Sequence, residues 1–300
     1  GGSALKHVLY KMEKNEYLGN CLAIVTKLDK TPAGFTRPEL LTFIKTDQKT
    51  YEQVESLEDI RRTDLFGRMT PCLRFGSECM FGMFGDSHCN CEDERKKALQ
   101  FIGENGGIYV HMPQEAQGNG LFYKAEELQL QVHGRLQSGR YIGMKTQAEA
   151  ARILRGHAVI DVREYDVIAS LFCDLGLEKY SYRVISRNPG KLKALEEEGI
   201  DVKGRIDLTS EMNMENLGEY LTKWIEKGYC FAEDEMEQVI ALLGSRERMP
   251  ERALRMCEKA AGILETAEGK ARLEQVMHAK EETIRCLEAE LLRFTCRLQK

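Results

Sequence analysis

Three cysteines at positions 79, 89 and 91 lie within thirteen residues, in the spacing C-x9-C-x-C. Zinc takes thiolate sulfur readily, and a site with three protein ligands keeps a fourth position open for water, as catalytic zinc sites do. Zinc lowers the pKa of such a water to about 7 and thereby provides hydroxide at neutral pH. We therefore interpret Cys79, Cys89 and Cys91 as zinc ligands, with three core cysteines as the alternative. We expect the side chain of His88 to point away from the metal.

Two further pairs of residues could take part in catalysis or in ligand binding. Asp161 and Arg163 stand two residues apart ahead of a helix, which on its own is typical of a surface ion pair. Asn188 and Pro189 suit the N-cap and the first helical position, so a helix is predicted to begin there. With Lys191 in its first turn, this helix start would suit a phosphate group; an ordinary helix start is the alternative.

Strands and helices that alternate after residue 71 must position these residues. Apolar runs and helical spacing predict the following elements: strands at 40–44, 73–75, 107–112 and 182–186, and helices at 92–102, 121–132, 147–154, 165–175 and 191–198. Residues 1–70 read as short strands and loops. The pattern predicts an α+β fold, with an α/β-like mixed sheet flanked by helices.

The sequence pattern changes after about residue 215, where no segment has a good strand pattern. Apolar side chains step by three and four residues from Ile284 to Leu298, which is helical spacing. We therefore expect two parts, a catalytic domain at 1–214 and a helical C-terminal extension at 215–300. The apolar stripe would serve packing or dimerisation.

Composition excludes several classes of protein. The 300 residues carry a formal net charge of −5, so the basic excess typical of nucleic-acid binders is missing. No run of 18 apolar residues occurs, which argues against a transmembrane helix. No signal-peptide pattern follows the first three residues, and we expect a cytoplasmic protein with no nucleic-acid or membrane partner.

Residues 71 to 208 resemble GTP cyclohydrolase II, a family of zinc enzymes that open the guanine ring in the first step of riboflavin synthesis. Five segments carry the resemblance, in matching order and spacing: Arg74-Phe75-Gly76-Ser77-Glu78-Cys79, Cys89-Asn90-Cys91, Gln114-Glu115-Ala116-Gln117-Gly118-Asn119-Gly120-Leu121, Asp161-Val162-Arg163-Glu164-Tyr165, and Ser186-Arg187-Asn188-Pro189-Gly190-Lys191. Each piece is weak alone, whereas five in register are specific.

The resemblance implies a role for each matching residue. The three cysteines would hold Zn²⁺, and zinc-activated water would attack C8 of the base and release formate. Glu115 would read the amidine edge of the base, since a carboxylate accepts two hydrogen bonds from such a pair of N–H groups. Asp161 would be the general acid and base. Arg163 would attack the α-phosphate, with release of pyrophosphate.

The remaining expected contacts bind the nucleotide. Ser186 and Lys191 take this role from the resemblance, and a bound polyphosphate would normally bring Mg²⁺. The family also implies a homodimer. The full set of expected substrate-binding residues is Arg74, Ser77, Glu78, Glu94, Glu115, Gln117, Ser186 and Lys191.

Departures from the family pattern concern the base and phosphate contacts. Pro113 and Gln117 stand where the family usually has arginines, and a neutral glutamine does not replace charge-assisted contacts. Glu94 stands where a base-contacting glutamine is usual. Gly76 replaces a histidine, and Leu128 aligns with a catalytic-site tyrosine. The spacing of the cysteines is also one residue shorter.

Several functions are compatible with this pattern. The first is a zinc-dependent cyclohydrolase that acts on GTP or a related purine nucleotide. The second is the same chemistry on another nucleotide, with a uracil base or fewer phosphates. A non-catalytic, nucleotide-binding relative is the third, and the intact Asp161 and Arg163 speak against it. Residues 215–300 are also compatible with an interaction module.

Overall fold

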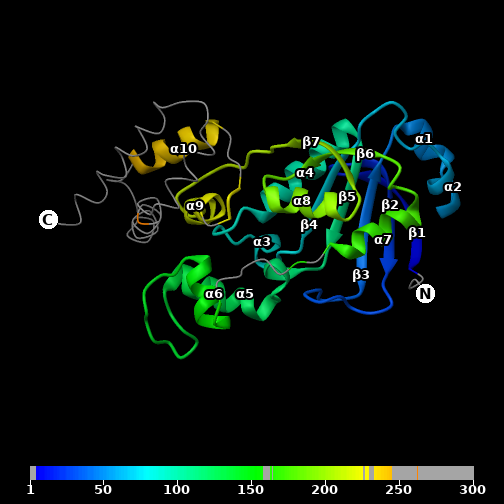
Figure 1. Ribbon diagram of the computed structural model, residues 1–300. Coiled ribbons are helices and arrows are strands. Elements are labelled where there is room, and N and C mark those ends of the chain that lie inside the picture. Colours follow the sequence, from blue (N-terminus) through cyan, green and yellow to red (C-terminus); the bar gives the residue numbers. More distant parts are fainter. Residues whose placement is uncertain are drawn as a thin grey trace.

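The computed structural model of the chain describes residues 5–157, 163, 165–225, 227–229, 233–244 and 262. In this part, seven strands form one mixed sheet in the order β1-β2-β3-β5-β4-β6-β7 (Figure 1). Their bounds are β1 Lys6–Asn15, β2 Gly19–Lys27, β3 Glu39–Lys45, β4 Cys72–Ser77, β5 Gly107–Met112, β6 Ser181–Ile185 and β7 Asp201–Ile206.

The sheet changes from antiparallel to parallel pairing at β5. Strands β1, β2, β3 and β5 pair antiparallel in turn, whereas β4 runs parallel to both β5 and β6, and β6 runs parallel to β7. The carboxyl ends of β4, β5 and β6 therefore meet at one edge of the sheet. In open sheets of this kind, ligands bind outside the carboxyl ends of the parallel strands.

Helices flank the sheet (Figure 1). Their bounds are α1 Gln48–Gln53, α2 Leu57–Arg62, α3 Met80–Met83, α4 Cys91–Asn105, α5 Leu121–Leu128, α6 Gln147–Arg155, α7 Asp166–Leu175, α8 Pro189–Glu197, α9 Leu217–Ile225 and α10 Glu233–Gly244. A short 3₁₀ turn, η1 (Glu115–Gly118), precedes α5, and a π-helical turn, η2 (Gln129–His133), follows it. No helix in the described ranges is long and apolar enough to cross a bilayer.

Alternation along β4 divides the core between the two faces of the sheet. Leu73 and Phe75 join a large cluster that includes Phe172 of α7, whereas Cys72 joins a second cluster with Leu99 of α4. Successive side chains of a strand point to opposite faces, so Arg74 lies on the α4 side with Cys72. This geometry brings Arg74 of β4 toward the first turn of α4.

The predicted mixed sheet with flanking helices is confirmed, and every strand and helix that was expected between residues 40 and 198 is present. Residues 1–70 differ from the expectation, because they contain a long β1–β2 hairpin and the two short helices α1 and α2. Strand β7 was not expected. It is a half-exposed edge strand with Lys203, Gly204 and Arg205 in its sequence, so it carries no apolar run. The predicted stripe from Ile284 to Leu298 lies outside the described residues.

Candidate functional site

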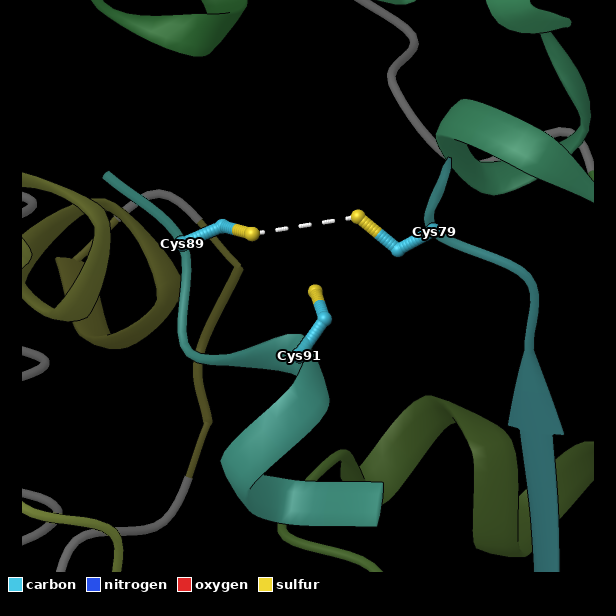
Figure 2. Close-up of side chains that lie close together, drawn as sticks. All are labelled: Cys79, Cys89 and Cys91. Atoms are coloured by element: carbon cyan, nitrogen blue, oxygen red, sulfur yellow. Dashed lines mark hydrogen bonds between the residues drawn. The ribbon is translucent and has the colours of Figure 1, made fainter. Parts of the chain in front are cut away.

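Three elements bring the cysteine sulfurs together at the carboxyl end of β4. Cys79 is the N-cap of α3, directly after the strand, Cys91 is the first residue of α4, and Cys89 lies in the loop between the two helices. The three Sγ atoms lie within 4.8 Å of one another, and those of Cys79 and Cys89 are 3.8 Å apart. Figure 2 shows the three side chains pointing toward a common point.

The donor set fits a zinc ion. Zn–S bonds of about 2.3 Å in a tetrahedral site place two sulfurs about 3.8 Å apart, as Cys79 and Cys89 are. His88 does not join the cluster, because its Nδ1 pairs with Asp86 Oδ1 at 2.6 Å. Among the described residues, the group therefore supplies three ligands and leaves a fourth position open, as a catalytic metal site requires.

The three cysteines shift the pKa of one another's thiols. Hydrogen bonds from Cys89 and Cys91 lower the pKa of Cys79, and contact with Cys79 raises the pKa of both partners. Zinc binds cysteine as the thiolate, so a divalent cation would displace the protons that remain on the three sulfurs. Gly82 of α3 lies against the sulfurs, since a Cβ there would be 3.0 Å from Cys89 Sγ.

A cavity of about 150 Å³ opens beside the sulfurs, at the edge where the parallel strands end. It gathers every expected site residue that the structure describes. Its lining includes Arg74, Ser77, Glu78, Cys79, Cys89, Cys91, Glu94, Glu115, Gln117, Arg163, Ser186 and Lys191. Asp161, the expected general acid and base, lies outside the described residues.

Glu115 follows β5 and faces the cavity from a tight backbone turn. Its carboxylate accepts hydrogen bonds from the backbone N–H groups of Met80, at 2.7 Å, and Ala116, at 3.1 Å. Burial raises the pKa of Glu115. Ala116 and Gln117 both adopt left-handed backbone conformations, with φ of 50° and 57°. Strain of this kind in non-glycine residues collects at functional sites, and here it aims the Glu115 carboxylate toward α3.

Glu94 is the centre of a charge network in the cavity wall. Its carboxylate pairs with Arg74 at 3.3 Å, Arg187 at 3.1 Å and Lys223 at 3.3 Å, and it accepts a hydrogen bond from Asn90 at 2.9 Å. Burial opposes ionisation, but the three cations outweigh it and hold the pKa of Glu94 well below its usual range. The carboxylate is therefore charged and fully engaged within the protein.

Other expected contacts also have partners in the protein. Arg163, three positions before α7 begins, donates to Ser77 Oγ at the end of β4, at 2.9 Å. Glu78 pairs with Arg37 at 2.9 Å. At α8, Asn188 caps the helix by accepting hydrogen bonds from Gly190 N and Lys191 N, so the predicted helix start is confirmed.

Ser186 and Lys191 lie on either side of that cap. Ser186 Oγ accepts a hydrogen bond from Asn188 N at 3.2 Å, and Lys191 Nζ donates to the carbonyl oxygen of Phe75 on β4. Both side chains are buried and line the cavity.

Sequence reasoning missed the contribution of the segment after residue 214. Glu219, Thr222, Lys223, Lys227 and Tyr229 all line the cavity. This stretch was expected to belong to a helical extension, because no good strand occurs after about residue 215, but no motif connected it with the cysteines. Lys223 reaches Asn90 Oδ1 at 2.6 Å across 133 positions of sequence, a contact that only the folded chain reveals.

The structure gives a physical reason for the glycine at position 76. A Cβ at Gly76 would lie 1.9 Å from the hydroxyl and 2.6 Å from Cζ of Tyr109. Tyr109 is buried against α4 and lines the cavity. Its ring thus takes the space that a side chain at position 76 would need.

Comparisons with known proteins point to one family. A family model described as GTP cyclohydrolase II matches residues 31–207, more than half of the chain. GTP cyclohydrolase-2 of Vibrio parahaemolyticus is 28% identical over 173 residues, which cover 55% of this chain and 74% of the relative. GTP cyclohydrolase-2 of Shewanella pealeana is 31% identical over 174 residues, with 56% and 77% covered. The monofunctional riboflavin biosynthesis protein RIBA 3, chloroplastic, of Arabidopsis thaliana is 29% identical over 174 residues, with 56% and 31% covered.

Proposed function

The chain belongs to the GTP cyclohydrolase II family, a hydrolase family, and from this premise we propose that it is a zinc-dependent nucleotide cyclohydrolase. The proposed reaction opens the base ring of GTP or a related purine nucleotide and releases formate, and pyrophosphate when the substrate is a triphosphate. The observation that carries the proposal is the convergence of three thiols on the cavity that also holds Glu115 and Arg163.

Cys79, Cys89 and Cys91 would hold the zinc, which when bound supplies the Lewis acidity that activates water at neutral pH. Glu115 would orient the base, since each carboxylate oxygen keeps a lone pair beyond its backbone hydrogen bond. Arg163 would meet the α-phosphate, with Ser77 as the group that fixes its guanidinium. Ser186 and Lys191 would bind the nucleotide beside the N-terminus of α8, and Mg²⁺ would accompany its phosphates.

Incubation of the chain with GTP tests this function, with formate and the loss of purine absorbance as readouts. We expect one formate for each GTP that is opened. Cys89→Ser should abolish turnover because it removes a zinc ligand. Cys173→Ser should leave turnover unchanged, because Cys173 is an exposed thiol on α7.

A second candidate is the same chemistry on another nucleotide. The charge network around Glu94 supports it. Glu94 stands where the family usually has a base-contacting glutamine, and three cations already bind its carboxylate, so this position has no amide N–H to donate to a base. A panel of purine and pyrimidine nucleotides with one to three phosphates separates the two candidates. Turnover of another nucleotide, and not of GTP, would select the second. A zinc-loaded chain that opens none of them would be a non-catalytic relative.

A further inference from the structure

Five described residues beyond the block that the family model matches line the cavity: Glu219, Thr222, Lys223, Lys227 and Tyr229. Leu217, Tyr220, Leu221 and Trp224 recur at helical spacing and are all buried, so one face of α9 is fixed to the body of the protein. Lys223, on another face of α9, and Lys227, after the end of the helix, line the cavity.

The cavity has an excess of positive charge. Eight lysine and arginine residues line it, against four glutamates, although the whole chain has a net charge of −5. A concave site with low-dielectric walls and one sign of charge concentrates ligands of the opposite sign. The described lining therefore suits an anion.

Lys227 differs from the other cations that line the cavity. The other seven each make a hydrogen bond or ion pair within the protein. Lys223 of the same segment, for example, pairs with Glu219 at 2.8 Å. Lys227 is half-buried and, within the described part of the chain, makes neither a hydrogen bond nor an ion pair.

An unpaired ammonium group in this position costs stability. Burial, together with the nearby charge of Lys223, lowers the pKa of Lys227 to about 8, although Glu127 and Glu219 act in the opposite direction. Folding thus disfavours the charged form of Lys227 at neutral pH, because the unfolded chain would hold the proton more tightly. A bound anion would reverse this penalty.

We propose that Lys227 binds a phosphate group of the nucleotide and so makes the segment after α9 part of the substrate site. This inference rests on the proposed function for the identity of the ligand. The lysine supplies an ammonium donor two residues before Tyr229, whose Oη accepts a hydrogen bond from Asn188 Nδ2 at the helix start of α8, at 3.3 Å. Charge-assisted hydrogen bonds to phosphate are the strong ones in proteins.

Titration calorimetry with inorganic pyrophosphate tests the proposal on the full zinc-loaded chain, with the zinc content measured afterwards. Lys227→Met should weaken pyrophosphate binding about tenfold, the loss expected for one charged hydrogen bond. Lys227→Arg should retain most of the affinity because it keeps the charge. Lys193→Met is the matched control, since that lysine is 78% exposed on α8 and pairs with the exposed Glu197.

Thermal unfolding without pyrophosphate separates binding from a structural role. Lys227→Met should leave the Tm unchanged or raise it, because it removes a half-buried charge that has no partner among the described residues. Wild-type affinity in Lys227→Met, an equal loss in Lys193→Met, or no pyrophosphate binding by the wild type would each overturn the inference. Formate release from a nucleotide would still support the proposed function in those cases. If the wild type binds pyrophosphate but opens no nucleotide, and Lys227→Met weakens that binding, the result would support the anion site and not the proposed function.

Discussion

At the scale of single residues, Gly76 and Tyr109 occupy one space between β4 and β5. The Tyr109 ring fills the position where a side chain at 76 would begin, and burial raises the pKa of its hydroxyl to about 12. Tyr109 therefore stays neutral and fixed in the cavity wall. The shape of the cavity near Cys79 depends on this glycine.

Gly76→Ala should destabilise the protein by about 1–3 kcal/mol, the cost of forcing an extra methyl group into a packed core. Urea unfolding measures the change. Gly204→Ala on β7 is the control, because a Cβ there meets nothing within 4 Å, and it should change stability by no more than about 0.5 kcal/mol. Equal stability of the two variants would contradict this prediction, because it would show that the Tyr109 ring moves aside at no cost in free energy.

The cysteine cluster could be predicted from the sequence, whereas the contact between Gly76 and Tyr109 could not. Zinc chemistry imposes a short-range spacing that can be read along the chain, and Cys79, Cys89 and Cys91 follow it. Gly76 and Tyr109 meet only because β4 pairs with β5 in one register, with Arg74 opposite Tyr109. Register is a property of the folded sheet, so composition and spacing do not reveal this contact.

At the scale of elements, Glu94 joins four segments of the chain. It lies in the first turn of α4 and pairs with Arg74 of β4, with Arg187 after β6 and with Lys223 of α9. Removal of one partner from a buried ion network leaves the others without compensation. This carboxylate therefore contributes to the attachment of α9, together with the buried apolar face of the helix.

Glu94→Gln should lower the free energy of unfolding at pH 7 by about 3 kcal/mol or more. Because the folded pKa of Glu94 is depressed, its contribution is present above the unfolded pKa of about 4.5 and is lost as pH falls below it. The difference between wild type and variant should accordingly shrink in acid. Glu197→Gln, which breaks only the exposed pair with Lys193, should cost at most about 1 kcal/mol at either pH. A Glu94→Gln deficit that is independent of pH would contradict the network.

Element types were predictable where apolar runs are long, as at 107–112 and 165–175. They were not predictable for β7 or for the role of α9. Lys223 and Glu94 are separated by 129 positions, and their attraction is electrostatic rather than periodic. The lack of strand patterns after about residue 215 therefore predicts a helical region but not what it contacts.

At the scale of the whole molecule, the cavity forms where three parallel strands end and where the chain after residue 214 returns to cover that edge. The separation into a domain at 1–214 and an extension at 215–300 stays a prediction, as does the homodimer. The described helices α9 and α10 lie in the expected extension, yet residues of α9 line the same cavity as the cysteines. We propose that 217–229 belongs functionally to the catalytic part.

The central claim is that three thiolates hold one zinc ion with a fourth position open. X-ray absorption at the zinc edge, on the chain purified without added metal, tests it most directly. The account predicts one zinc per chain with three sulfur neighbours at about 2.3 Å and one oxygen or nitrogen neighbour at about 2.0 Å. Zinc should be lost in Cys89→Ser and retained in Cys173→Ser. A zinc-free native chain, or a zinc ion with four sulfur neighbours, would contradict the account.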